Sequence, residues 1–325
     1  ELVGPAAVNR DIFNVPTVEN SGRIVKRGAG ATVFAPGIFI HTGLVRVEGG
    51  ELMVRVDSGS ILGGAFEAAA GTRLGFTVGN FTSLPGNPLD LGPNSRLSGA
   101  GDIRFEGSPT VQGAVDLDGS LETWADARFS GPVRVGTRYV NRFGEATFSG
   151  QFAEFTGPVL SHGRTVFATA SEARLQDLTV AENGGLTANG IVLVQGTLSV
   201  SNKATFAGPR RLSVFGPANF QGTISGVQLT LELGGVTTFL PGASLNLGNA
   251  RVVAQLGSEL RLDGLTSLTA AELRVFGRLT KTSADPLAIA AGLTGTGEFE
   301  VAGGSVDLAG QGTFRGTLLV GPPAS

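Results

Sequence analysis

Two aspartates, Asp116 and Asp118, are the residues best placed to do chemistry, because they alternate with apolar residues in Val115-Asp-Leu-Asp118. Side chains alternate along a strand, so both carboxylates would project from one face while Val115 and Leu117 take the other. Glycoside hydrolysis uses paired carboxylates at a fixed separation across a groove. The sequence specifies no second acidic residue opposite this pair, and outward, solvated positions are the simpler interpretation. We therefore expect no catalytic residue and no enzyme.

Other chemical motifs are sparse. With no Cys and only two His, His41 and His162, we expect no metal site, no disulfide and no cysteine nucleophile. No phosphate-binding glycine loop and no Gly-x-Ser-x-Gly elbow occurs, so we expect no cofactor. Ser161-His162-Gly163-Arg164 is similar to the His-Gly element of pectin-cleaving β-helices. The Asn-Thr-Asp and Asp-Asp elements that accompany it there are missing.

Composition limits the partners. The net charge of -3 offers no basic surface for phosphates, so nucleic acid is not an expected partner. No apolar run approaches the roughly 18 residues of a spanning helix, so no membrane span is expected. Met53 is the only Met, so Glu1 is not a translation start. Either a signal peptide was removed or the chain is an excised fragment. We favour removal of a signal peptide, which predicts an exported protein outside the cell or on its surface.

The elements that must carry these residues are short alternating strands that end in Gly, Asn or Pro. Glycines 257, 277 and 297 recur at a spacing of about 20 residues, which predicts a single-domain, all-β β-solenoid with coils of that length. About 15 or 16 such coils, each adding roughly 4.8 Å, would fit the chain. A β-sandwich or barrel is the rival fold, but two-residue hairpin turns are scarce. Only Ser171 to Gln176 and Ala284 to Ala291 are candidate helical turns.

The 20 Phe residues contrast with one Trp, Trp124, and one Tyr, Tyr139. Carbohydrate platforms favour Trp and Tyr, so this composition weakens a sugar-binding hypothesis. Phe recurs in Phe-x-Gly, which we interpret as internal stacking between coils. The Phe-x-Gly residues are Phe129, Phe148, Phe155, Phe206, Phe220 and Phe314.

Basic residues are almost all Arg, with Lys only at Lys26, Lys203 and Lys281. Arg forms forked hydrogen bonds to carboxylates, which favours Arg–Asp/Glu ladders between coils. A GC-rich genome would produce the same bias.

The stretch from Lys26 to Leu52 resembles the autotransporter-associated, or passenger-associated, β-strand repeat. The residues that carry the resemblance are Lys26, Gly28, Gly30, Gly37, Thr42-Gly43, Val45, Val47, Gly49-Gly50 and Leu52. Ala31-Thr32, Pro36 and Phe39-Ile-His41 depart from the pattern. A weaker copy runs from Gly295 to Val320. The resemblance implies right-handed parallel β-helix coils of an exported surface protein, often an adhesin, without an active site.

The two ends predict an assembly interface. We divide the chain into an N-terminal segment 1–22 that could add a strand to a neighbour, a solenoid 23–320 and a tail 321–325. Neither end shows a polar cap, so either the chain is cut from a longer solenoid or its ends meet other copies end to end. The expected contact residues are Ile12, Phe13, Val15, Val18, Phe314, Leu318 and Val320.

The expected function is therefore a non-enzymatic structural subunit of a surface fibre, filament or sheath, whose partner is another copy of itself. An adhesin or passenger stalk with a surface glycan or protein as partner is the alternative. A polysaccharide-degrading β-helix enzyme is a third reading.

Overall fold

The computed structural model describes residues 2–3, 7–8, 17–57, 59–79, 89–168, 172–208 and 210–321. Its secondary structure is all β-strand, and the described residues contain no helix. The chain divides into two compact units, unit 1 (Glu1–Gly157) and unit 2 (Pro158–Ser325).

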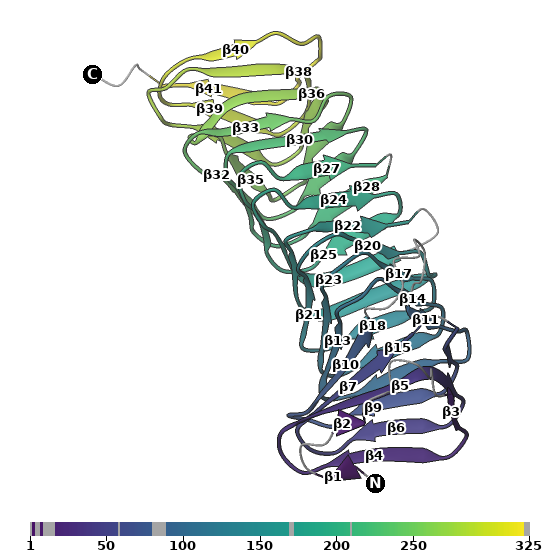
Figure 1. The fold of residues 1–325 in the computed structure, drawn as a ribbon. Coiled ribbons are helices and arrows are strands. Elements are labelled where there is room, and N and C mark those ends of the chain that lie inside the picture. Colours follow the sequence, from purple (N-terminus) through teal and green to yellow (C-terminus); the bar gives the residue numbers. More distant parts are fainter. Residues whose placement is uncertain are drawn as a thin grey trace. The chain divides into compact units, whose positions relative to one another are not determined.

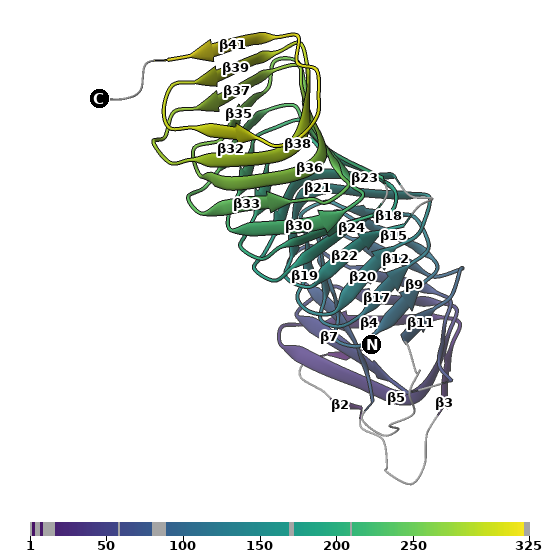
Figure 2. The same cartoon turned by 90° about the horizontal axis from the view of Figure 1, so that it is seen from above.

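Each unit is built from coils of three strands, and each strand pairs in parallel with the strand three places further along the chain in the regular part. Three faces result, along which strands of successive coils lie side by side (Figures 1 and 2). Parallel pairing of successive coils at about 20 residues per turn defines a β-solenoid, so the predicted fold class is confirmed.

In unit 1 the first face holds β1 (Leu2–Val3), β4 (Arg23–Arg27), β6 (Leu44–Val47), β9 (Ala65–Ala68), β12 (Arg96–Gly99), β15 (Ala114–Leu117), β18 (Val133–Val135) and the start of β21 (Phe152–Ser161). The second face holds β2 (Ala7–Val8), the start of β5 (Ala31–His41), β7 (Glu51–Val56), β10 (Arg73–Val78), β13 (Asp102–Phe105), β16 (Ser120–Thr123) and β19 (Arg138–Asn141). The third face holds β3 (Thr17–Asn20), the end of β5, β8 (Ile61–Leu62), β11 (Leu89–Leu91), β14 (Pro109–Val111), β17 (Ala127–Phe129) and β20 (Glu145–Phe148).

In unit 2 the first face holds the start of β23 (Glu172–Val180), β25 (Ile191–Val194), β28 (Arg211–Val214), β31 (Thr230–Leu233), β34 (Arg251–Ala254) and the ends of β36 (Leu265–Val275) and β38 (Leu287–Gly295). The second face holds the end of β23, β26 (Leu198–Val200), β29 (Ala218–Phe220), β32 (Val236–Phe239), β35 (Glu259–Arg261), β37 (Arg278–Lys281), β39 (Glu298–Val301) and β41 (Thr317–Val320). The third face holds β22 (Arg164–Phe167), β24 (Gly185–Ala188), β27 (Thr205–Ala207), β30 (Thr223–Val227), β33 (Ala243–Asn246), the starts of β36 and β38, and β40 (Val306–Leu308).

The coils number about 14, slightly fewer than the 15 or 16 expected. Some coils are short, such as the one between the register partners Asp116 and Arg134, which are 18 residues apart. Others are longer than the glycine spacing suggests, such as the coil between the register partners Arg73 and Asp102. Longer coils near the beginning of the chain explain the lower count.

The two candidate helical turns contain no described helix and lie mostly in strands. Residues 172–176 belong to β23, and residues 287–291 belong to β38. Their apolar residues alternate in burial with a period of two, because the inner side of a coil accepts every second side chain. Pairing with the coils on either side decides the conformation of these short segments, which local sequence leaves open.

A continuous aromatic ladder fills the interior of unit 1. Phe66 and Phe76 have ring centroids 5.1 Å apart, Phe76 and Phe105 stack at 5.1 Å, and Phe129 and Phe148 stack at 5.0 Å. Each ring is buried, which favours folding by roughly 1.5–3 kcal/mol per side chain. The predicted inward position of the Phe-x-Gly residues is confirmed for Phe129, Phe148, Phe155, Phe206 and Phe220, all buried, whereas Phe314 is only half-buried. Ring contacts join Phe129 to Phe148, Phe148 to Phe155, and Phe220 to Phe239.

Candidate assembly interface and surface sites

The predicted N-terminal contact residues are only partly described. Ile12, Phe13 and Val15 lie outside the residues that the structure describes. Val18 is half-buried in β3 and is the register partner of Phe39 in β5. One edge of β3 is therefore occupied within the chain, so the strand addition predicted for residues 1–22 would have to use the opposite edge.

The last coil of unit 2 exposes apolar side chains at positions that earlier coils bury. Leu318 in β41 is the register partner of Phe299 in β39, yet Leu318 is 57% exposed and Phe299 only 1%. Val320 is 72% exposed, and Phe314 is half-buried and bridges to Gly295. Among the described residues, β41 is therefore the last strand of this face, and its inward apolar side chains are not covered by a further strand. The predicted residues Leu318 and Val320 lie on this surface, which we name the terminal rung (Leu318 and Val320).

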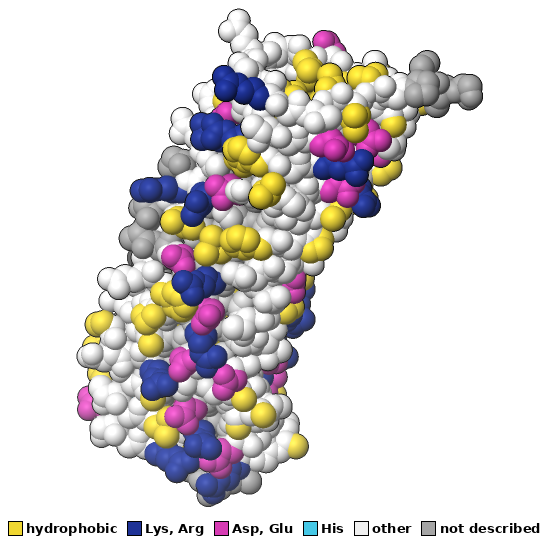
Figure 3. Space-filling view, turned by 180° about the vertical axis from the view of Figure 1, so that it is seen from behind, with side chains coloured by type: hydrophobic (Ala, Val, Ile, Leu, Met, Phe, Trp, Pro, Cys, Tyr) yellow, Lys and Arg dark blue, Asp and Glu magenta, His cyan; other side chains and the backbone are white. Residues whose placement is uncertain are grey.

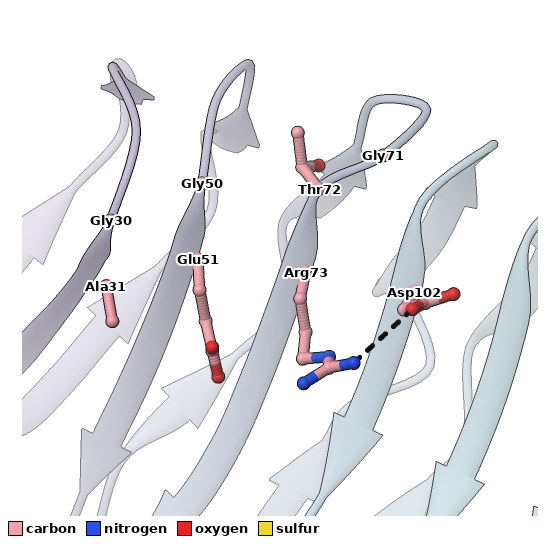
Figure 4. A pocket seen from close by; sticks show the side chains of 8 residues that line it. All are labelled: Gly30, Ala31, Gly50, Glu51, Gly71, Thr72, Arg73 and Asp102. Atoms are coloured by element: carbon pink, nitrogen blue, oxygen red, sulfur yellow. Dashed lines mark ion pairs between the residues drawn. The ribbon is translucent and has the colours of Figure 1, made fainter.

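A shallow depression of about 390 Å³ lies over the corners at which second-face strands of unit 1 begin. Arg73 projects between the neighbouring strands, and its guanidinium lies 3.6 Å from the carboxylate of Asp102 (Figure 4). Glu51 lies on the other side of Arg73, so the two carboxylates flank a cation and do not oppose each other across a groove. The remaining lining residues are Gly30, Ala31, Gly50, Gly71 and Thr72. This arrangement forms a surface ion pair and supplies no acid–base pair.

Asp116 and Asp118 project outward from β15 and the corner after it, as expected. Arg134 on the next coil donates hydrogen bonds to both carboxylates, each at 2.7 Å. These hydrogen bonds raise the pKa of the Arg134 guanidinium. The pair is therefore tied up in an ion-pair ladder between coils. His162 is also exposed, whereas Ser161 beside it is buried and donates to the Gly163 carbonyl.

Ion pairs between neighbouring coils recur on the first face of both units, as the excess of Arg predicted. In unit 1, Glu48 accepts from Arg27 at 2.8 Å, and that hydrogen bond lowers the pKa of Glu48. In unit 2, Glu272 lies 2.6 Å from Arg251 and 2.9 Å from Arg274. Basic and acidic side chains lie beside one another on the face that Figure 3 presents. Exposed pairs of this kind contribute about 0–1 kcal/mol each, so they tune the surface more than they stabilise it.

Two buried lysines were missed by the sequence reasoning. Lys26, at the end of β4, donates to the carbonyls of Arg27, Gly28 and Gly49 at 3.0, 2.7 and 3.1 Å. Lys281, at the end of β37, likewise turns inward and donates to Ser283. Both lysines are fully buried. The register partner of Lys26 on the next coil is Val47, and Gly49-Gly50 begins two residues after it. The register partner of Lys281 is Val301, and Gly303-Gly304 begins two residues after it. The sequence feature that could have indicated them is the scarcity of Lys, because two of the three lysines donate hydrogen bonds to the backbone at coil corners.

Within the described ranges, no group of three or more His, Asp or Glu side chains is placed to hold a metal ion. The same residues include no helix of the length and hydropathy that crossing a membrane requires.

Comparison with known proteins adds no relative. No protein family, curated protein or solved structure matches the chain.

Proposed function

We propose that the chain is a non-enzymatic structural protein of the cell exterior, the subunit of a fibre or sheath that grows by stacking coil on coil. The terminal rung carries this proposal. Leu318 continues a column whose previous member, Phe299, is buried, so covering it with another coil would remove exposed apolar surface from water. A second copy is the best complement, because its coils present parallel strands with the same spacing and inward apolar positions.

The ion-pair ladders support a structural role over a catalytic one. Asp116 and Asp118 are occupied by Arg134, and Asp102 by Arg73. A glycosidase typically uses two carboxyl groups that oppose each other across a groove, and these carboxylates instead pair with cations on adjacent coils. Chemistry at these positions would have to break the contacts that tie the coils together.

We further infer that the segment from Lys26 to Leu52 is a coil of the autotransporter-associated type. The residues of the resemblance have physical reasons in this fold. Lys26 donates to three corner carbonyls, and a Cβ on Gly50 would lie 2.2 Å from the carbonyl oxygen of Gly30. This coil type favours an exported surface protein, and it supports a passenger stalk as the second candidate function.

Polymer formation tests the first proposal. We expect the purified chain to form polymers at micromolar concentration, seen by light scattering and negative-stain microscopy. The double variant Leu318→Lys/Val320→Lys should remain monomeric, because two charges on the terminal rung cannot be buried against a neighbour. Leu256→Lys is the matched control: Leu256 is an exposed apolar residue on a corner of unit 2, away from the terminal rung.

The outcomes separate the candidates. A wild-type chain that stays monomeric, or polymers that survive the double variant unchanged, would exclude stacking through the terminal rung. Deletion of residues 1–20 should also abolish polymers if the N-terminal coil is the complementary end. The stalk candidate requires a parent polypeptide much longer than this one, and the intact mass of the native protein would show it.

A further inference from the structure

The chain's one tryptophan lies on the surface of unit 1 beside an exposed phenylalanine. Trp124 directly follows β16, and Phe143 lies just beyond β19, the parallel partner of β16. The two corners are therefore neighbours on successive coils. The rings meet edge to face with centroids 6.1 Å apart, and they are 38% and 61% exposed. We name Trp124 and Phe143 the aromatic corner.

Polar side chains hold the indole of Trp124 in place. Arg104, one coil earlier, places its guanidinium carbon 4.3 Å from the ring centroid and so covers one face of the ring. Glu122 accepts hydrogen bonds from Trp124 and, at 2.6 Å, from Arg142. Burial alone would raise the pKa of Glu122, but these hydrogen bonds and the charges of Arg142 and Arg104 lower it. The exposed part of Trp124 therefore belongs to a ring of fixed orientation.

The backbone of both corners is also held. The Trp124 N–H donates to the Phe105 carbonyl at 3.0 Å, and the Glu145 N–H donates to the carboxylate of Asp126 at 2.7 Å. A ligand that binds here would meet groups that are already ordered. Binding to ordered groups costs little conformational entropy, so even a small contact area can give measurable affinity.

Charged side chains surround the aromatic corner. Arg104 pairs with Glu106 at 2.7 Å, and Arg142 pairs with Glu122 at 2.6 Å. Two cations and two anions therefore form ion pairs beside the rings, and the carboxylates of Asp126 and Glu145 belong to the same corners, so the rim is not suited to an anionic ligand. Its guanidinium and carboxylate groups are suited instead to hydroxyl groups, which both donate and accept hydrogen bonds.

We propose that the aromatic corner binds a sugar ring of a neutral polysaccharide. The apolar C–H face of a pyranose packs on an exposed indole or phenyl ring, while its hydroxyls reach polar groups at the rim. Two partly exposed rings are far smaller than the roughly 800 Å² per partner of a stable protein interface, so a sugar ring fits the area better than a protein does. This inference does not depend on polymer formation.

The single tryptophan makes a direct test possible, because intrinsic emission reports on Trp124 alone. The full chain is titrated with maltoheptaose, cellohexaose, xylohexaose, mannohexaose, chitohexaose and a soluble galactan. We expect a saturable change in emission with at least one of them. Calorimetry with that sugar should show at least tenfold weaker binding for Trp124→Ala and several-fold weaker binding for Phe143→Ala.

Phe215→Ala is the matched control, because Phe215 is an exposed ring on a corner of unit 2. It should bind the sugar as the wild type does, and far-UV circular dichroism should show that all three variants are folded. No change in emission with any of the six sugars overturns the proposal. Unaltered affinity of Trp124→Ala overturns it equally.

Discussion

The ammonium group of Lys26 crosses from its own coil to the next and donates a hydrogen bond to the carbonyl of Gly49, 3.1 Å away. Two further bonds, to the carbonyls of Arg27 and Gly28, use the remaining N–H groups. A fully buried ammonium is tolerated because all three of its donors are satisfied. Lys26 thus fastens a glycine corner of one coil to that of its neighbour.

Lys26→Met should therefore loosen the coils around this corner. The change keeps most of the side-chain volume but leaves buried carbonyls without a donor, which costs roughly 1–3 kcal/mol. Long repeat arrays need not unfold in one step, so amide hydrogen exchange over residues 24–50 is the suitable measurement. Lys203→Met is the control, because Lys203 is exposed and should change exchange very little. Equal effects of the two changes would contradict the clamp.

A second prediction concerns acid and His41. The imidazole is fully buried and stacks on Phe39 at 5.1 Å; Nδ1 lies 3.0 Å from the Asn20 amide nitrogen, and Nε2 lies 3.2 Å from the Ala65 carbonyl oxygen. Burial lowers the pKa of His41, and the carbonyls of Ala65 and Asn20 only partly oppose the shift.

The sign of the pH effect follows from that shift. The unfolded chain takes up the proton near pH 6.5, at a higher pH than the folded chain does. The contribution to stability is therefore complete above about pH 6.5, falls as the pH drops towards the lowered pKa, and changes no further below it. Hydrogen exchange in β3 and β5 should become faster between pH 7.5 and pH 5, after correction for intrinsic exchange. His41→Phe should remove this dependence and His162→Gln should retain it; an unchanged slope in His41→Phe would refute the assignment.

The alternation of apolar and polar residues and the spacing of glycines were sufficient to predict the coils. An alternation with a period of two can be read from neighbouring residues alone, without knowledge of contacts that are distant in sequence. Leu52, Val54 and Val56 are buried in β7 as their spacing indicates. The inward position of Phe129 and Phe148 was also predictable, since Phe-x-Gly repeats with the coil. Ion pairs between coils were expected in general from the excess of Arg, but the specific pairing of Arg134 with Asp116 was not predicted.

The buried polar residues could not be predicted from the alternation of apolar and polar residues. Whether Lys26 or His41 points inward depends on acceptors supplied by other coils, Gly49 and Ala65, and the register that brings them together is set by the whole stack. The exposure of Trp124 could not be predicted either. Its exposure results from its place on a corner beside Phe143, and its sequence neighbours contain no mark of that position.

The aromatic ladder gives a third prediction. Phe148 stacks on Phe129 at 5.0 Å and is buried, whereas Phe143, only a few residues away, is exposed. Phe148→Ala should leave a cavity and destabilise unit 1 by about 3–5 kcal/mol, and Phe143→Ala should cost less than about 1 kcal/mol. Resistance to proteolysis over a temperature series measures both. A Phe148→Ala protein as resistant as the wild type would mean that the ladder contributes little.

The last prediction distinguishes two reasons for a glycine: lack of space for a side chain between neighbouring coils, and the conformational freedom of the glycine backbone. A Cβ on Gly43 would lie 2.0 Å from the carbonyl oxygen of Gly22 on the coil before, a distance that no side-chain adjustment can relieve because the obstacle is backbone. Gly92, in contrast, has no atom within 4 Å of an added Cβ. Neither glycine has the positive φ that would strain alanine, so the two substitutions differ mainly in the space available.

Gly43→Ala must therefore push two coils apart, at a cost of roughly 1–3 kcal/mol or more, and should speed exchange of the amides around residues 20–45. Gly92→Ala should be neutral or stabilise by up to about 1 kcal/mol, because alanine reduces the freedom of the unfolded chain. If both variants lose the same stability, intrinsic strand preference and not coil-to-coil contact selects glycine at Gly43. A loss confined to Gly43→Ala would show that the Thr42-Gly43 element is set by the distance between neighbouring coils.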